Sequence, residues 1–84
     1  MNIKLGGLKI EVKYVPSNEL EKDCGQADFA LGTIKINKDL SKENKDLTLL
    51  HEILHHIDPA LTESQIELYS RALYQVLHDN KLKF

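Results

Sequence analysis

Three residues in the second half of the chain have the types and the spacing that metal binding requires. They are His51, Glu52 and His55, in the order His-Glu-x-x-His. On an α-helix, residues four positions apart lie on the same face, so both imidazoles can point at one ion. Glu52 would then lie beside that ion, where its carboxylate can accept a proton from an activated water. The spacing therefore predicts His51 and His55 as metal ligands and Glu52 as a general base.

A catalytic zinc ion usually has three protein ligands and one water, so a third ligand is needed. The helix predicted after the motif offers Glu63 and Glu67. On a helical wheel Glu63 lies closer to the apolar stripe, so we predict Glu63 as the third ligand and keep Glu67 as the alternative. Asp58 is a further candidate, either as a ligand or as an acceptor that orients a histidine. His56 falls nearly opposite the apolar stripe and is predicted to be solvated.

The motif lies in a segment with the pattern of an amphipathic helix. Ser41 is a suitable N-cap, and Asp58-Pro59 should end the helix because the residue before a proline avoids the helical region. The predicted buried face consists of apolar residues at helical spacing: Leu47, Leu50, Ile53, Leu54 and Ile57.

A second helix is predicted to follow. Thr62 and Gln65 have the spacing of a capping box, and the helix should reach residues 79–80. Tyr69 and Tyr74 are possible hydrogen-bond donors to a reacting oxyanion, although packing is the favoured use of Tyr69. The apolar stripe predicted to pack on the first helix comprises Ile66, Tyr69, Leu73, Val76 and Leu77.

The first half of the chain has the pattern of strands and turns. Gly6-Gly7 should form a tight turn between a short strand at residues 3–5 and a longer one at residues 8–14. Alternation predicts one buried face for the longer strand, comprising Leu8, Ile10, Val12 and Tyr14. A helical turn is expected at residues 19–22, and a hairpin at residues 29–31 and 33–36 around Gly32. The predicted fold is α+β: a small antiparallel sheet followed by two packed helices, in a single domain of residues 1–84.

Composition narrows the possible partners. A net charge of −2 without a clustered basic face argues against nucleic acid. No apolar run approaches the roughly 18 residues of a membrane span, and residues 1–9 do not resemble a secretory signal. Cys24 is the single cysteine, which suits a free thiol in a reducing compartment. We therefore expect a cytoplasmic protein.

Several segments together resemble a known family. Gly-Thr-Ile-Lys-Ile-Asn at residues 32–37, the motif at residues 49–55 and the tail at residues 61–67, 73–77 and 79–80 are similar to small phage and prophage zincin-like proteins related to the ImmA/IrrE metallopeptidases. The resemblance implies His51, His55 and Glu63 as zinc ligands and Glu52 as the catalytic base. It also implies that the strand at residues 33–37 is an edge strand that aligns an extended peptide or protein substrate.

Two functions follow as hypotheses. The first is a zinc-dependent metallopeptidase that hydrolyses a peptide bond through zinc-activated water, with Glu52 as the base. The alternative is a non-catalytic, zinc-stabilised phage or prophage module that binds a host protein. A closed structural site needs four protein ligands, so His56 or Asp58 would have to supply the fourth. Glu52 favours the first hypothesis because a purely structural site has no use for it.

Overall fold

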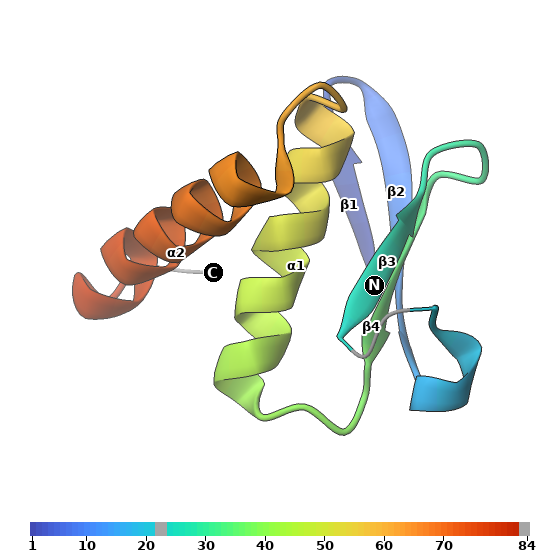
Figure 1. The fold of residues 1–84 in the computed structure, drawn as a ribbon, viewed down its shortest axis with the longest axis horizontal. Coiled ribbons are helices and arrows are strands. Elements are labelled where there is room, and N and C mark those ends of the chain that lie inside the picture. Colours follow the sequence, from blue (N-terminus) through green and yellow to red (C-terminus); the bar gives the residue numbers. More distant parts are fainter. Residues whose placement is uncertain (22–23, 83–84) are drawn as a thin grey trace.

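The computed structural model describes residues 1–21 and 24–82, and its first half forms a sheet that two helices follow (Figure 1). The strands are β1 (Asn2–Leu5), β2 (Leu8–Val15), β3 (Gly25–Asp28) and β4 (Thr33–Asn37), with a 3-10 turn η1 (Ser17–Glu19) after β2. The helices are α1 (Lys42–Ile57) and α2 (Glu63–Asp79). This arrangement confirms the predicted α+β fold.

The sheet is mixed, which corrects the prediction of an antiparallel one. Its strand order is β1-β2-β4-β3. The outer pairs are antiparallel, whereas β2 and β4 are parallel, with Val12 opposite Ile34. Parallel neighbours need a long crossover connection, and here that connection contains η1 and β3. As a result β3 lies at the edge of the sheet and β4 lies inside it.

The turns agree only in part with the sequence prediction. Gly6 and Gly7 do form the tight turn between β1 and β2, with φ values of 56° and 83° that favour glycine. The predicted hairpin strand at residues 29–31 is wrong, because these residues form the turn between β3 and β4. The predicted helical turn at residues 19–22 is replaced by η1, and Lys22 lies outside the described residues.

The core lies between the sheet and α1. Its buried cluster combines β2, β4 and α1: Ile10, Val12, Ile34, Ile36 and Leu49. Leu8 and Tyr14 were predicted on the buried face of β2, but both side chains are exposed. Lys45 Nζ lies 5.7 Å from the centre of the Tyr14 ring, so this tyrosine contacts the rim of the helix.

The bounds of α1 follow the predicted signals. Ser41 Oγ accepts a hydrogen bond from the Asn44 N–H, and the helix ends at Asp58 as expected. Its buried residues, however, are Leu49, Glu52 and Leu54, whereas Ile57 is exposed. The predicted buried face was therefore rotated, because α1 packs against the sheet on one side and against α2 on another.

Helix α2 begins with the predicted capping box. Thr62 Oγ1 accepts a hydrogen bond from the Gln65 N–H, and Gln65 Oε1 accepts one from the Thr62 N–H. Its predicted apolar stripe is mostly uncovered. Ile66 is fully buried against the rest of the molecule, but most of the others are exposed: Tyr69, Leu73 and Val76. The reason is the course of α2, whose C-terminal turns project away from α1 and the sheet (Figure 1). Neither helix is long and apolar enough to cross a membrane within the described residues.

Candidate metal centre

The motif residues lie together on α1, where the two histidines are partly exposed and Glu52 is buried. One side-chain atom from each of His51, Glu52 and His55 falls within 4.8 Å of the others. The two imidazole rings are 5.1 Å apart between centroids, as expected for positions one helical turn apart. The histidine side chains are 18 and 20% exposed, so a ligand can reach them from the solvent. These three residues form a group that could hold a metal ion.

Helix α2 adds a carboxylate to this group. Glu63 Oε1 lies 3.0 Å from His55 Nε2, and Glu63 Oε2 lies 3.3 Å from His51 Nε2. Glu63 occupies the first position of α2, directly after the Thr62 cap, and only residues 58–62 separate it from α1. The short interhelical turn and the capping box thus bring the Glu63 side chain to both histidines.

These distances suit a tetrahedral metal. Zinc bonds to histidine nitrogen and carboxylate oxygen are about 2.0–2.2 Å long, so neighbouring donor atoms in a tetrahedron lie about 3.3 Å apart. The contacts of Glu63 with the two Nε2 atoms, at 3.0 and 3.3 Å, are close to that separation. Glu52 Oε1 is more distant, at 4.0 Å from His51 Nε2. The Glu63 carboxylate therefore lies nearer to His51 Nε2 than the Glu52 carboxylate does.

Glu67 contacts the other edge of the His51 ring. Its Oε1 lies 3.1 Å from His51 Nδ1, whereas the Nε2 atom of the same ring points at Glu63. The second oxygen, Oε2, accepts a hydrogen bond of 3.4 Å from Arg71 Nε. Glu67, the alternative third ligand, thus contacts His51 at the ring nitrogen that does not face Glu63.

The Glu52 side chain is buried between α1 and β3. It is 5% exposed, and the edge strand β3 passes directly beneath it at Gly25. A Cβ atom at Gly25 would stand 2.8 Å from Thr48 Cγ2 and 2.9 Å from the Lys35 carbonyl oxygen, and 3.7 Å from Glu52 Cγ. Glycine therefore allows the strand to approach the motif helix closely enough to enclose Glu52.

Two other predicted candidates lie elsewhere. Asp58 caps the turn between the helices, where its Oδ1 accepts a hydrogen bond from the Ala60 N–H. His56 is not solvated as predicted: its Nδ1 lies 3.3 Å from the Glu52 carbonyl oxygen and its ring packs 4.8 Å from that of Phe29. His56 Nε2 is buried and has no hydrogen-bond partner among the described residues. The β3–β4 turn covers this ring, which the helical wheel of α1 alone does not reveal.

The two tyrosines proposed as oxyanion donors lie outside the lining of the site. Tyr69 is 42% exposed on the uncovered face of α2. Tyr74 stacks on His78, with 5.3 Å between the ring centroids. Loss of hydration, followed by the nearby Glu43 carboxylate, raises the pKa of Tyr74 above its ordinary value.

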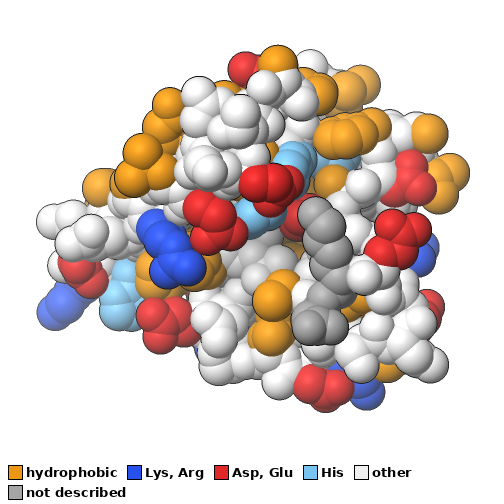
Figure 2. Space-filling view, viewed as in Figure 1, with side chains coloured by type: hydrophobic (Ala, Val, Ile, Leu, Met, Phe, Trp, Pro, Cys, Tyr) orange, Lys and Arg blue, Asp and Glu red, His pale blue; other side chains and the backbone are white. Residues whose placement is uncertain are grey.

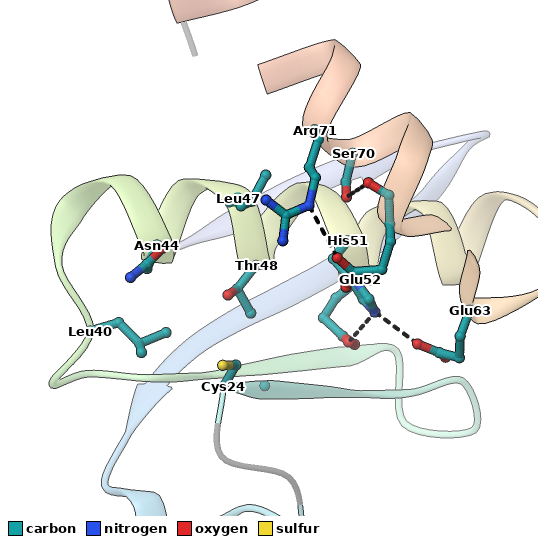
Figure 3. Close-up of a pocket in the computed structure, with 12 residues that line it drawn as sticks. Cys24, Leu40, Asn44, Leu47, Thr48, His51, Glu52, Glu63, Ser70 and Arg71 are labelled. Carbon is teal, nitrogen blue, oxygen red and sulfur yellow. Dashed lines mark hydrogen bonds and ion pairs between the residues drawn. The ribbon is translucent and has the colours of Figure 1, made fainter. Parts of the chain in front are cut away.

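Two cavities flank Glu52 along the edge strand. The larger, of about 400 Å³, opens between α1 and α2 on the His51 side and includes Glu63, Glu67 and Arg71 (Figure 3). The smaller, of about 240 Å³, lies on the His55 side beside Ala27 and Phe29. Glu52 and Gly25 line both cavities. Both cavities lie against β3 beside the candidate metal ligands, and we refer to the two together as the groove.

The strand order corrects the prediction of which strand aligns the substrate. The sequence and the family resemblance assigned that role to residues 33–37 as an edge strand, but β4 is paired on both sides, by β2 and by β3. The edge strand beside the candidate metal centre is β3, which the sequence did not indicate as a strand. None of its four residues, Gly-Gln-Ala-Asp, is β-branched or aromatic, so strand propensity does not indicate a strand here.

The sequence interpretation gives Arg71 no role and considers Glu67 only as the alternative third ligand. A usable signal was present, because Glu63, Glu67 and Arg71 recur at four-residue spacing and so share one face of α2. Figure 2 shows histidine side chains near the centre of the visible face, with acidic side chains around them and a basic group beside them. The polar face of α2 is therefore part of the site.

Comparison with known protein families, with curated proteins and with solved structures found no match to this chain.

Proposed function

We propose that this protein is a zinc-dependent metallopeptidase of the His-Glu-x-x-His type. The observation that carries the proposal is the contact of one carboxylate with two histidines, Glu63 with His51 and His55, beside the buried Glu52. Two histidines and one glutamate are a common ligand set of catalytic zinc, in which the fourth position stays open for water. The earlier resemblance to ImmA/IrrE-related proteins agrees with this ligand set.

Each residue has a separate role in the proposed reaction. When bound, zinc acts as a Lewis acid that polarises the substrate carbonyl and lowers the pKa of water. His51, His55 and Glu63 hold the ion. Glu52 accepts the proton of the attacking water and delivers it to the leaving amine, and its burial keeps bulk water away from the transfer.

Glu67 is proposed to orient His51. With Nε2 directed to the ion, the Nδ1–H of the same ring donates to Glu67 Oε1, which fixes both the tautomer and the ring plane. Arg71 holds the other carboxylate oxygen of Glu67. The chain Arg71–Glu67–His51 thus links α2 to the metal ligand on α1.

The substrate is proposed to be a peptide segment that lies along β3. Among the described strands, β3 pairs only with β4, so its outer edge can accept main-chain hydrogen bonds from an added strand. The groove beside β3 runs past Glu52 and both histidines. A peptide bound there would bring a carbonyl group to the open position of the ion.

The non-catalytic alternative has less support. A closed zinc site was expected to use His56 or Asp58 as its fourth ligand, but His56 packs on Phe29 and Asp58 caps the interhelical turn. Of the other nearby carboxylates, Glu67 contacts the opposite edge of the His51 ring and Glu52 Oε1 lies 4.0 Å from His51 Nε2. An open fourth position is therefore the arrangement that this side-chain geometry favours.

The test combines metal content with hydrolysis. Elemental analysis of the purified protein for zinc, iron and manganese should give about one zinc per chain, as expected for a single site with this ligand set. The wild type and Glu52→Gln would then be incubated with a fluorogenic peptide library. We expect Glu52→Gln to retain zinc and to lose at least about a hundredfold in turnover, since general-base catalysis contributes about 10²–10⁴-fold.

The control is Glu43→Gln, which removes an exposed glutamate from the first turn of the same helix. It should retain both zinc and turnover. Equal turnover of the wild type and Glu52→Gln, with zinc bound in both, would refute the catalytic role. Failure of the wild type to bind zinc after reconstitution would refute the metal site itself.

A further inference from the structure

Among the described residues that line the larger cavity, Arg71 is the cation, and it is the only arginine in the sequence. The other charged residues that line this cavity are acidic: Glu52, Glu63 and Glu67. The neighbouring wall on α1 is formed by Asn44, Leu47 and Thr48. A single guanidinium thus faces the part of the cleft that lies beyond the candidate ligands.

The guanidinium has one edge occupied and one edge directed into the cleft. Its Nε donates to Glu67 Oε2 at 3.4 Å. Figure 3 shows its two terminal nitrogens turned away from that contact, towards the α1 wall near Leu47 and Thr48. These two nitrogens form a planar fork that matches the two oxygens of a carboxylate. The side chain is 67% exposed, so an incoming ligand can reach it.

Charge balance favours an anionic group at this position. In the proposed zinc-bound enzyme the two positive charges of the ion offset those of Glu52 and Glu63, and Arg71 offsets Glu67 in the same way. A ligand carboxylate at the far edge of the guanidinium would therefore meet a site without net negative charge. The amide of Asn44 lies along the same wall and has no side-chain hydrogen-bond partner among the described residues, so it can add a donor.

We propose that Arg71 determines specificity by binding a carboxylate of the substrate in the cavity between α1 and α2. The proposal rests on the proposed peptidase function and adds a substrate class to it. The carboxylate is either an acidic side chain near the scissile bond or the C-terminal carboxylate of the peptide. Arg71 keeps its Nε bond to Glu67 and uses its terminal nitrogens for the substrate.

The test measures binding with peptide hydroxamates, which attach to zinc through the hydroxamate group. The first kind of acid–amide pair carries glutamate or glutamine next to the hydroxamate. This pair is made twice, once with the hydroxamate at each end of the peptide. A second pair has a glutamine side chain and ends in a free carboxylate or in an amide. The acid-to-amide affinity ratio cancels any change in the strength of the zinc anchor, and the two pairs distinguish the sources of the carboxylate.

We expect one pair to show an acid preference of about tenfold, the size of one charge-assisted hydrogen bond. Arg71→Gln should abolish this preference, Arg71→Lys should retain only part of it, and Lys38→Gln should leave it unchanged. Lys38 is an exposed cation in the turn after β4, and its removal changes the net charge by the same amount.

NMR gives a direct readout, because a chain with one arginine has one arginine Nε–H resonance. The acidic probe of the preferred pair should shift this resonance. The amide partner should leave the resonance near its chemical shift in the zinc-loaded protein without a probe. If the amide probes bind but no pair prefers the acid, or if the preference survives Arg71→Gln, the specificity role is refuted. If no hydroxamate binds the zinc-loaded protein, the proposed metallopeptidase site fails, and the role of Arg71 fails with it.

Discussion

His51 Nδ1 lies 3.1 Å from Glu67 Oε1, on the ring edge opposite the nitrogen that points at Glu63. One imidazole is therefore held between two glutamates of α2 that are one helical turn apart. A carboxylate in this outer position fixes the histidine tautomer and increases its basicity as a ligand. We therefore propose different roles for the two acidic residues, although they have the same side chain and lie on the same helix face.

This difference predicts a graded effect on zinc affinity. Glu67→Gln keeps the size of the side chain and removes the charge, so zinc affinity should fall by about 10–100-fold without loss of the site. Competition with a chromophoric chelator measures this affinity. Glu43→Gln is the matched control on α1 and should change it little, whereas an unchanged affinity in Glu67→Gln would argue against the orienting role.

The assignment of the third ligand can be tested with two further variants. Glu63→Ala removes the carboxylate that contacts both histidines and should lower zinc affinity more than Glu67→Gln does, by at least about a hundredfold. Asp58→Ala removes only the cap on the Ala60 N–H. It should cost about 1 kcal/mol in the free energy of unfolding and leave the zinc content intact. Loss of zinc in Asp58→Ala, with zinc retained in Glu63→Ala, would instead identify Asp58 as the third ligand.

Zinc should stabilise this small domain against heat. Zinc at a hundred times its dissociation constant adds about 2.7 kcal/mol if it binds only the folded state, which corresponds to about 10–20 °C in Tm for a domain of this size. Differential scanning calorimetry with and without zinc measures the shift. His51→Ala and His55→Ala should abolish it.

His56→Ala is the control for this experiment, because it removes a neighbouring histidine whose ring packs on Phe29. Its Tm should still rise with zinc, whatever its starting value. Loss of the zinc-induced shift in His56→Ala would place His56 among the ligands and restore the closed, structural site.

Gly25→Ala should destabilise the fold at the floor of the groove. The added Cβ would stand 2.8 Å from Thr48 Cγ2 and 2.9 Å from the Lys35 carbonyl oxygen, so β3 must shift away from α1. Overpacking of this kind costs about 1–3 kcal/mol in the free energy of unfolding, measured by urea denaturation.

A double-mutant cycle with Thr48→Ser tests the cause of this cost. Serine removes Cγ2 and keeps the hydroxyl, so it should recover part of the stability lost in Gly25→Ala. The recovery should be incomplete because the contact with the Lys35 carbonyl remains. Additive effects of the two substitutions would show that the approach of β3 to α1 is not the reason for glycine at this position.

The sequence by itself determined the local features of this protein. The helix ends are specified by Ser41, Pro59 and the Thr62–Gln65 box, whose effects depend on hydrogen bonds and sterics within a few residues. The relation of His51 to His55 is equally local, since it follows from the geometry of one helix. The α+β order could be predicted for the same reason, from residue periodicity along successive segments.

The tertiary structure decided how these segments meet. Which glutamate faces the His51 and His55 Nε2 atoms depends on the turn between α1 and α2, and the edge position of β3 depends on the parallel pairing of β2 with β4. Periodicity cannot specify either, because it identifies a face of an element but not the neighbour that covers it. The exposed stripe of α2 illustrates this limit: the pattern is amphipathic, yet the direction of the helix leaves most of its apolar face uncovered. The arrangement of Glu63, Glu67 and Arg71 around His51 was likewise set by long-range packing, which no local pattern encodes.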